Sequence, residues 1–140
     1  MSQVETNKAL AREFFRRIWN EREEAAIDAL HDENAVGNDP DFGTGKEAFR
    51  AHWKTWMAAF PDLHFEIVDL IGEGEKVLTR WRLTGTHLGP GDFMGVAPSG
   101  RAIDVMGMSL DTIRGGLVVE GCDGWDAYGL RKQLGALPAD

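Results

Sequence analysis

Hydrophobic positions change their spacing once along the chain, close to Pro61. Before it, apolar residues recur every three or four positions, which is typical of amphipathic helices. After it, they alternate with polar residues, as in half-buried strands. The first pattern predicts helices over residues 3–20, 22–31 and 46–59. The second predicts strands over residues 63–71, 76–87 and 101–113 and a last strand from residue 117, before a short closing helix over 127–134.

Glycine, proline and small polar residues mark the breaks between these elements. Residues 31–45 are rich in Asn, Asp, Gly and Pro and are expected to be mostly loop. Residues 89–100 form a second loop, and its Phe93 points either to a pocket rim or to a loop anchored on the core. Gly107 predicts a bulge or bend within its strand. Two capping boxes are expected at helix starts: Ser2 with Glu5, and Thr44 with Glu47.

Three helices followed by four turn-connected strands indicate an α+β domain. Neighbouring strands should pair antiparallel, with the N-terminal helices packed on one face of a curved sheet. A strongly bent sheet closed by helices forms a cone that encloses an apolar pocket. No linker or repeat divides residues 1–140, so we expect a single domain.

Composition narrows the function classes. The net charge is -8 and no basic run is present, which argues against nucleic acid and anionic membrane as partners. The only cysteine is Cys122, which suits a reducing cytoplasm, and no stretch has the pattern of a signal peptide or a membrane span. No motif typical of a metal or nucleotide site occurs, so no metal and no cofactor are predicted.

The clearest chemical signal is Asp123, in the last strand. Strand residues alternate between faces, so Val119, Gly121, Asp123 and Trp125 should share one side. A carboxylate on an apolar face is costly unless it is paired or used. The alternative is that the strand frays after Glu120 and leaves Asp123 solvated.

Aromatic residues supply the candidate walls of a pocket. His52 can border the apolar face of its helix, because it lies beside Trp53 and one turn before Trp56. From there it can orient a carbonyl of a substrate or lie at the surface. Plain core packing is the simplest interpretation of Trp19, whereas Arg80 and Arg82 alternate away from the apolar face and should meet solvent. The candidate substrate-binding residues are Trp19, His52, Trp53, Trp56, Phe93, Ser109 and Trp125.

Four segments together resemble the SnoaL-like polyketide cyclase family of the nuclear transport factor 2-like superfamily: Phe60 to Leu63, Gly85 to His87, Gly95 to Arg101, and Gln133 to Gly135. The resemblance implies an α+β cone and an intramolecular aldol ring closure without metal or organic cofactor. It also implies one acid/base carboxylate ten residues before the Gln of the closing Gln-Leu-Gly, which is Asp123. Trp19 falls at an aromatic pocket position of the family, and His52 at a pocket position that varies.

The chain departs from this family pattern at two positions. Gly121 and Ser109 stand where cyclases carry histidine. From the resemblance as a whole, we expect a cyclase-type enzyme that acts on a hydrophobic, carbonyl-containing small molecule. Trp125 should partly shield Asp123 from water and raise the pKa of its carboxyl group.

A non-catalytic binding module of the same fold is the second hypothesis. The third is a ketosteroid-isomerase-like or epoxide-hydrolase-like enzyme, which needs Tyr128, a protonated Asp or an inward-facing arginine. A homodimer is expected, as is common in this superfamily.

Overall fold

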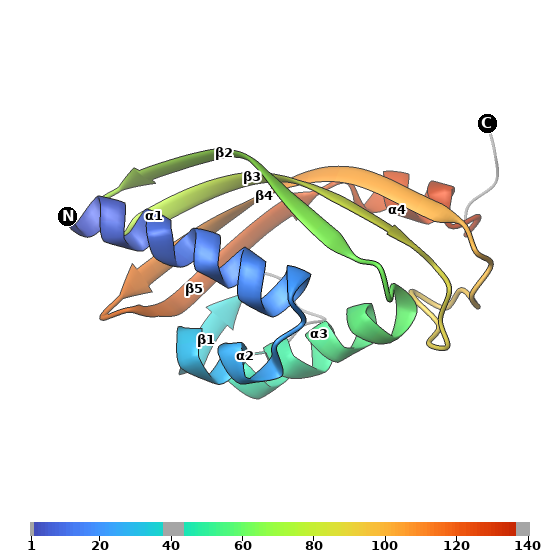
Figure 1. Cartoon of the computed structure of the whole chain (residues 1–140), viewed down its shortest axis with the longest axis horizontal. Helices are drawn as coiled ribbons and strands as arrows, with labels where there is room; N and C mark the ends of the chain where they lie inside the picture. Colours follow the sequence, from blue (N-terminus) through green and yellow to red (C-terminus); the bar gives the residue numbers. More distant parts are fainter. Residues whose placement is uncertain (1, 38–43, 137–140) are drawn as a thin grey trace.

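A computed structural model describes residues 2–37 and 44–136 (Figure 1). Helices form most of the first half, and long strands form most of the second, as the change in hydrophobic spacing predicted. The helical elements are α1 (Gln3–Phe14), the π-helix η1 (Phe15–Asn20), α2 (Glu24–Leu30), α3 (Lys46–Ala59) and α4 (Ala127–Gln133). The strands are β1 (His31–Gly37), β2 (His64–Glu73), β3 (Lys76–Thr86), β4 (Ala102–Arg114) and β5 (Leu117–Trp125).

One sheet carries all five strands in the order β1-β5-β4-β3-β2. Neighbours from β2 to β5 pair antiparallel, as expected, whereas β1 lies parallel to β5. The interpretation of residues 31–45 as mostly loop was therefore wrong for residues 31–37; residues 38–43 lie outside the described part. Most β1 side chains are polar, so the segment lacks the alternation of apolar and polar residues that predicts a strand. It is held in the sheet by its contacts with β5 and α3.

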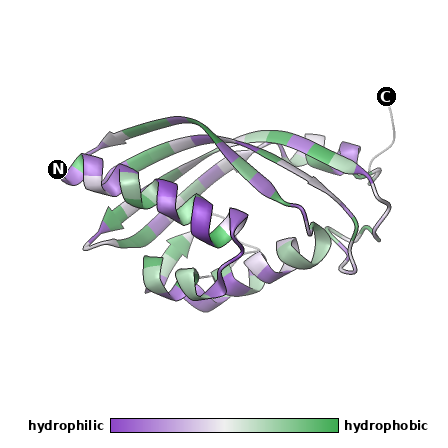
Figure 2. Ribbon diagram, in the orientation of Figure 1, coloured by the Kyte–Doolittle hydropathy of each residue, from purple (hydrophilic) through white to green (hydrophobic). Residues whose placement is uncertain are grey.

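The sheet curves over α1, α2 and α3, which lie along its concave side (Figure 1). Apolar faces of α1, η1, α2 and α3 meet the inward-facing residues of the strands in one core (Figure 2). Ser2 accepts a hydrogen bond from the Glu5 amide at 3.1 Å and starts α1, as its capping box predicted. Among the described residues, no helix combines the length and apolar character needed to span a bilayer.

The end of the first predicted helix is a π-helix rather than an α-helix. Its i→i+5 hydrogen bonds widen the turn, so consecutive and near-consecutive residues share the inner side. Phe15, Ile18 and Trp19 are all buried in it. The side-chain amide of Asn20 then exchanges two hydrogen bonds with the backbone of Phe65 on β2, at 2.8 and 2.9 Å. This widened turn therefore places an aromatic wall against the sheet.

The two sheet faces differ sharply in polarity. On β3, Val77, Thr79, Trp81 and Leu83 are buried, as alternation predicted. On the other face, Arg80 pairs with Asp69 at 2.7 Å and Arg82 pairs with Asp104, so neither arginine reaches the concave side.

Glycine at position 107 reflects a close approach rather than a bulge. The β3–β4 pairing runs regularly through Gly107 opposite Trp81. A Cβ at Gly107 would lie 2.4 Å from the Trp81 ring and 2.6 Å from the Trp125 Cβ, so the indole needs the space. The second predicted capping box is also absent: α3 begins after Gly45, whose φ of 98° favours glycine, and no side chain caps it.

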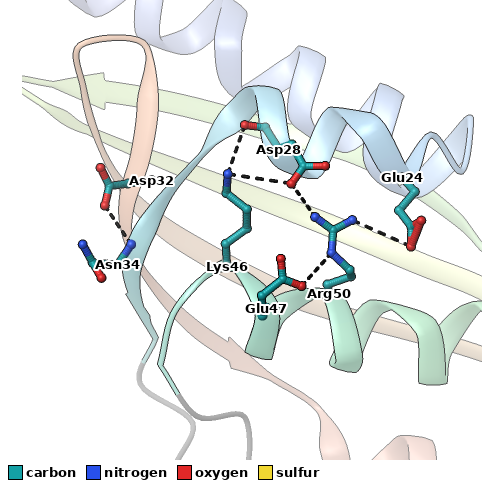
Figure 3. A network of polar contacts seen from close by, with 7 residues as sticks. All are labelled: Glu24, Asp28, Asp32, Asn34, Lys46, Glu47 and Arg50. Atoms are coloured by element: carbon teal, nitrogen blue, oxygen red, sulfur yellow. Dashed lines mark hydrogen bonds and ion pairs between the residues drawn. The ribbon is translucent and has the colours of Figure 1, made fainter.

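A polar network fixes α2 against α3 beside β1 (Figure 3). Arg50 of α3 reaches Asp28 and Glu24 of α2 and also Glu47 of its own helix. Lys46 donates to the Asp28 carbonyl at 3.4 Å. Because α2 leads directly into β1, these contacts hold the edge strand beside β5.

Candidate functional site

The concave side of the sheet and the helices enclose a cavity of about 290 Å³. Its walls are largely aromatic, with three kinds of polar side chain: two imidazoles, one hydroxyl and two carboxyl groups. The backbone of β1 also contributes to the wall. The lining residues are Phe14, Phe15, Trp19, His31, Ala35, Val36, Gly37, Gly45, Phe49, His52, Trp56, Phe65, Trp81, Leu83, Ser109, Asp111, Val118, Gly121, Asp123 and Trp125. Among these described residues there is no lysine or arginine.

Most residues predicted for the site meet at this cavity. Asp123 and Trp125 come from β5, and Ser109 comes from β4. The aromatic and imidazole candidates from the helical layer that line the cavity are Trp19, His52 and Trp56. Elements far apart in sequence thus bring six of the predicted residues to one wall.

Trp53 and Phe93 are placed elsewhere. The Trp53 indole donates to the Ile18 carbonyl at 2.8 Å and is buried between α3 and η1. The Phe93 ring packs 4.3 Å from Trp56 and 5.2 Å from Phe60, centroid to centroid. Of the two interpretations of loop 89–100, the structure shows a loop anchored on the core.

Asp123 lies opposite Ser109 in the β4–β5 ladder, with both side chains on the cavity side. Asp123 is exposed rather than desolvated. Ser109 is buried, and its Oγ accepts a hydrogen bond of 2.9 Å from the Trp81 indole. The Ser109 hydroxyl hydrogen remains available to donate, because the indole can only donate.

The alternation predicted for β5 holds only from Gly121 onward. Val118, not Val119, faces the cavity. The reason is a register shift between Thr112 and Ile113, opposite this part of β5, which changes the side that the residues face. Glu120 is exposed and does not line the cavity.

Two imidazoles border the cavity as neutral groups. The Trp56 indole donates to His52 Nε2 at 2.9 Å, so the neutral ring carries its proton on Nδ1. His31 is buried against Phe49 and Phe14, with centroids 4.2 and 5.1 Å away. Burial lowers the pKa of His31 to about 4.

Asp111 is the carboxyl group that the sequence did not single out. It is 8% exposed, lines the cavity, and lies opposite Gly121 in the ladder. Burial, and next the charge of Asp123, raise the pKa of Asp111 to about 8. No described residue gives its carboxylate a hydrogen bond or an ion pair.

A sequence signal for Asp111 existed. It alternates with Ile103, Val105 and Ser109 on the inner face of β4, two residues beyond a predicted site residue. Trp81 was also on a predicted inner face. No alternation pointed to His31, because residues 31–45 were predicted to be mostly loop.

Within residues 2–37 and 44–136, no three His, Cys, Asp or Glu side chains gather as metal ligands. What the cavity offers instead is a proton acceptor, a buried carboxyl group, a hydroxyl donor and aromatic surface.

Known families and structures match this chain along most of its length. The profile of the SnoaL-like polyketide cyclase family matches residues 9–134. A search of curated proteins found no match.

Several solved structures share the fold and modest identity. TsrD from Streptomyces laurentii has 29% identity and a TM-score of 0.83, over 92% of this chain and 94% of that chain. AclR from Streptomyces galilaeus, provisionally described as a hydroxylase, has 27% identity and a TM-score of 0.82, over 97% and 89%. IdmH from Streptomyces antibioticus, provisionally described as a polyketide cyclase, has 25% identity and a TM-score of 0.76, over 92% and 98%.

Proposed function

The chain belongs to the SnoaL-like polyketide cyclase family, and we propose that it is a cofactor-independent acid/base enzyme that closes a ring in a hydrophobic, carbonyl-containing small molecule by an intramolecular aldol reaction. The observation that supports this most is the position of Asp123. It stands on β5 beside Ser109, in a cavity lined by the indoles of Trp19, Trp56 and Trp125.

In the proposed reaction, the Asp123 carboxylate removes a proton from a carbon next to a carbonyl. The resulting enolate carbon forms a bond to a second carbonyl carbon of the same molecule, and the π bond of that carbonyl breaks. The new alkoxide takes the proton back from Asp123, which restores the carboxylate. General acid/base catalysis of this kind contributes roughly 10²–10⁴-fold.

Cavity size and surface support a flat, apolar substrate. A volume of about 290 Å³ is at the lower end of small-molecule pockets, about 300–1,000 Å³. Aromatic rings that meet a substrate edge-on or offset hold it in one orientation. Folding the substrate so that its reacting carbons meet supplies a further rate advantage.

Two alternatives require different chemistry from the same fold. An epoxide-hydrolase-like Asp–Arg–Asp set would need an inward arginine, but Arg80 and Arg82 pair with aspartates on the outer face. A ketosteroid-isomerase-like enzyme that uses a tyrosine donor would need Tyr128, which is 59% exposed in α4. A binding module without catalysis remains the second candidate. A measurement of turnover distinguishes it from an enzyme, because a binding module would bind a small molecule without converting it.

Two properties of the assembly are also proposals. We expect a homodimer that uses the outer sheet face, where Met106 and Met108 are 38% and 48% exposed. A monomer in sedimentation equilibrium would contradict it. Cytoplasmic location stays a prediction from the single cysteine.

A general probe tests the base without the natural substrate. Nitrobenzisoxazole is flat and apolar, and removal of its ring C–H proton breaks the N–O bond to release a coloured cyanophenolate. We expect Asp123→Asn to lower its turnover by about 10²-fold or more. Glu120→Gln, an exposed carboxylate on the same strand that does not line the cavity, should leave turnover unchanged.

Retained turnover in folded Asp123→Asn would contradict the assignment of the base. A native protein that binds the probe but does not turn it over would favour the binding module.

A further inference from the structure

The buried carboxyl of Asp111 has no part in the single-carboxylate mechanism above, yet it lies within the same site. Its ladder partner is Gly121, and Asp123 is two residues further along β5 on the same face. Diagonal positions of this kind in an antiparallel pair are about 7–8 Å apart between Cα atoms. A substrate of modest size can therefore contact both carboxyl groups at once.

Glycine at position 121 makes this placement possible. A Cβ at Gly121 would lie 3.2 Å from Asp111 Oδ1, so any side chain there would compete with the carboxyl for space. The polar group next to Gly121 in the cavity is therefore the Asp111 carboxyl of β4, and not a side chain of β5.

We infer that Asp111 is a second catalytic residue, a neutral carboxylic acid that gives its proton to the substrate oxygen while Asp123 removes the carbon-bound proton. The inference rests on the proposed function, because it needs Asp123 as the base. In the aldol step, the Asp111 O–H bond breaks as the alkoxide O–H bond forms. The proton that Asp123 received then passes to Asp111, which returns both groups to their starting states.

The surroundings of Asp111 favour its neutral form. From β5 it faces the carboxylate of Asp123, and the other titratable groups that line the cavity are His31 and His52. Lys76 of β3 donates instead to the neighbouring Thr112 hydroxyl at 2.9 Å. The buried face of α1 presents uncharged residues, namely Asn7, Ala11 and Phe14.

These groups give no cation that would stabilise an Asp111 carboxylate, and the rise of its pKa to about 8 agrees with this. An acid with such a pKa is protonated at neutral pH and is well matched to proton donation there. Apolar sites of other enzymes also keep an aspartic acid neutral, so that it can donate a hydrogen bond to an oxygen that gains negative charge.

A leaving-group comparison separates proton donation from a structural role. Benzisoxazole without the nitro group releases a more basic phenolate, so its reaction gains more from an acid. We expect Asp111→Asn to lower turnover of benzisoxazole by about 10²-fold and of nitrobenzisoxazole by only a few-fold. A variant that merely disturbs the cavity would slow both equally, and that result would overturn the inference.

The base and the acid fail in distinguishable ways. Asp123→Asn should slow both probes to the same extent, because both lose a C–H proton. If it slows neither, the proposed base is wrong, whatever Asp111 does.

Titration of Asp111 gives a readout that needs no turnover. Carboxyl ¹³C NMR of the full chain, assigned by the signal lost in Asp111→Asn, should show Asp111 protonated at neutral pH. Asp104→Asn, at an exposed aspartate on the same strand, identifies a control signal whose pKa is lowered rather than raised. An Asp111 signal that titrates in the normal acidic range would overturn the inference.

Discussion

Asp104 and Asp111 stand on the same strand, β4, and face opposite sides of the sheet. On the outer face, hydrogen bonds from the Arg82 guanidinium hold the pKa of Asp104 below its ordinary value. On the inner face, burial and the charge of Asp123 raise the pKa of Asp111. Aspartate thus favours its charged form on one side of the sheet and its neutral form on the other. Strand alternation decides which side each carboxyl group faces, and its surroundings there decide the direction in which its pKa shifts.

At a single pH, the largest expected difference between the two faces concerns packing. Gly107→Ala places a methyl group against the Trp81 ring and the Trp125 Cβ, on the inner face. We expect this overpacking to lower the free energy of unfolding by about 3 kcal/mol. Urea denaturation followed by tryptophan fluorescence measures it.

Its outer-face control is Gly124→Ala, the same substitution at a β5 position where an added Cβ meets open space. That change should stay within about 0.5 kcal/mol. Equal effects at the two positions would mean that the faces do not differ in packing.

A second difference should appear in how stability depends on pH. Asp111 keeps its proton in the folded state up to about pH 8, whereas its ordinary pKa is 3.8. Between these values the unfolded chain has released the proton and the folded chain retains it. Stability therefore falls as pH rises through this window, by about 1.4 kcal/mol per pH unit at most.

Asp111→Asn removes the pH-dependent contribution of Asp111 to the free energy of unfolding. The free energy of unfolding of this variant, relative to the native protein, should therefore increase from pH 4 to pH 8, as measured by urea denaturation at each pH. Asp104→Asn should show the opposite sign, and only at pH values near and below the ordinary pKa of 3.8. The pKa of Asp104 is lowered, so its contribution is present above its unfolded pKa and is lost as pH falls through the folded pKa. A flat difference curve for Asp111→Asn would contradict the buried, neutral acid.

The smallest effect on folding, with a clear effect on chemistry, is expected at Gly121. Gly121→Ala leaves a strand-compatible backbone but pushes on the Asp111 carboxyl. We expect stability within about 0.5 kcal/mol of the native protein and turnover of benzisoxazole lower by about threefold to tenfold. Gly124→Ala has open space around its Cβ and should change neither quantity. Equal turnover in both variants would argue against a positional role for Gly121.

Much of this fold followed from the sequence because its longest segments keep one period. Helix α3 occupies the predicted range, and the four antiparallel strands follow from clear alternation. β1 could not be found in this way. It is short and polar, and it is held by its pairing with β5 and by the contacts of Arg50 rather than by its own apolar face.

The candidate site was partly predictable for the same reason. Alternation brought Asp123, Ser109 and Trp125 to one wall, and helical spacing brought Trp19 and Trp56. Alternation failed wherever the ladder shifts register. A shift between Ile67 and Asp69 turns Asp69 to the outer face, whereas regular alternation from Phe65 and Ile67 would place it with these apolar residues. Register shifts arise from pairing between strands, which no single strand encodes.

The π-helix η1 makes the aromatic wall depend on chain length. A π-turn contains one residue more than the α-helical turn that it replaces. Deletion of a single residue between Phe15 and Ile18, with conversion of the π-turn to an α-turn, would keep the flanking positions in phase and allow the Asn20 contacts with β2 to remain. It would also narrow the turn, which now buries Phe15, Ile18 and Trp19 together, and so change the aromatic wall. A difference of one residue in length at this point is therefore enough for a protein of the same fold to have a differently shaped cavity.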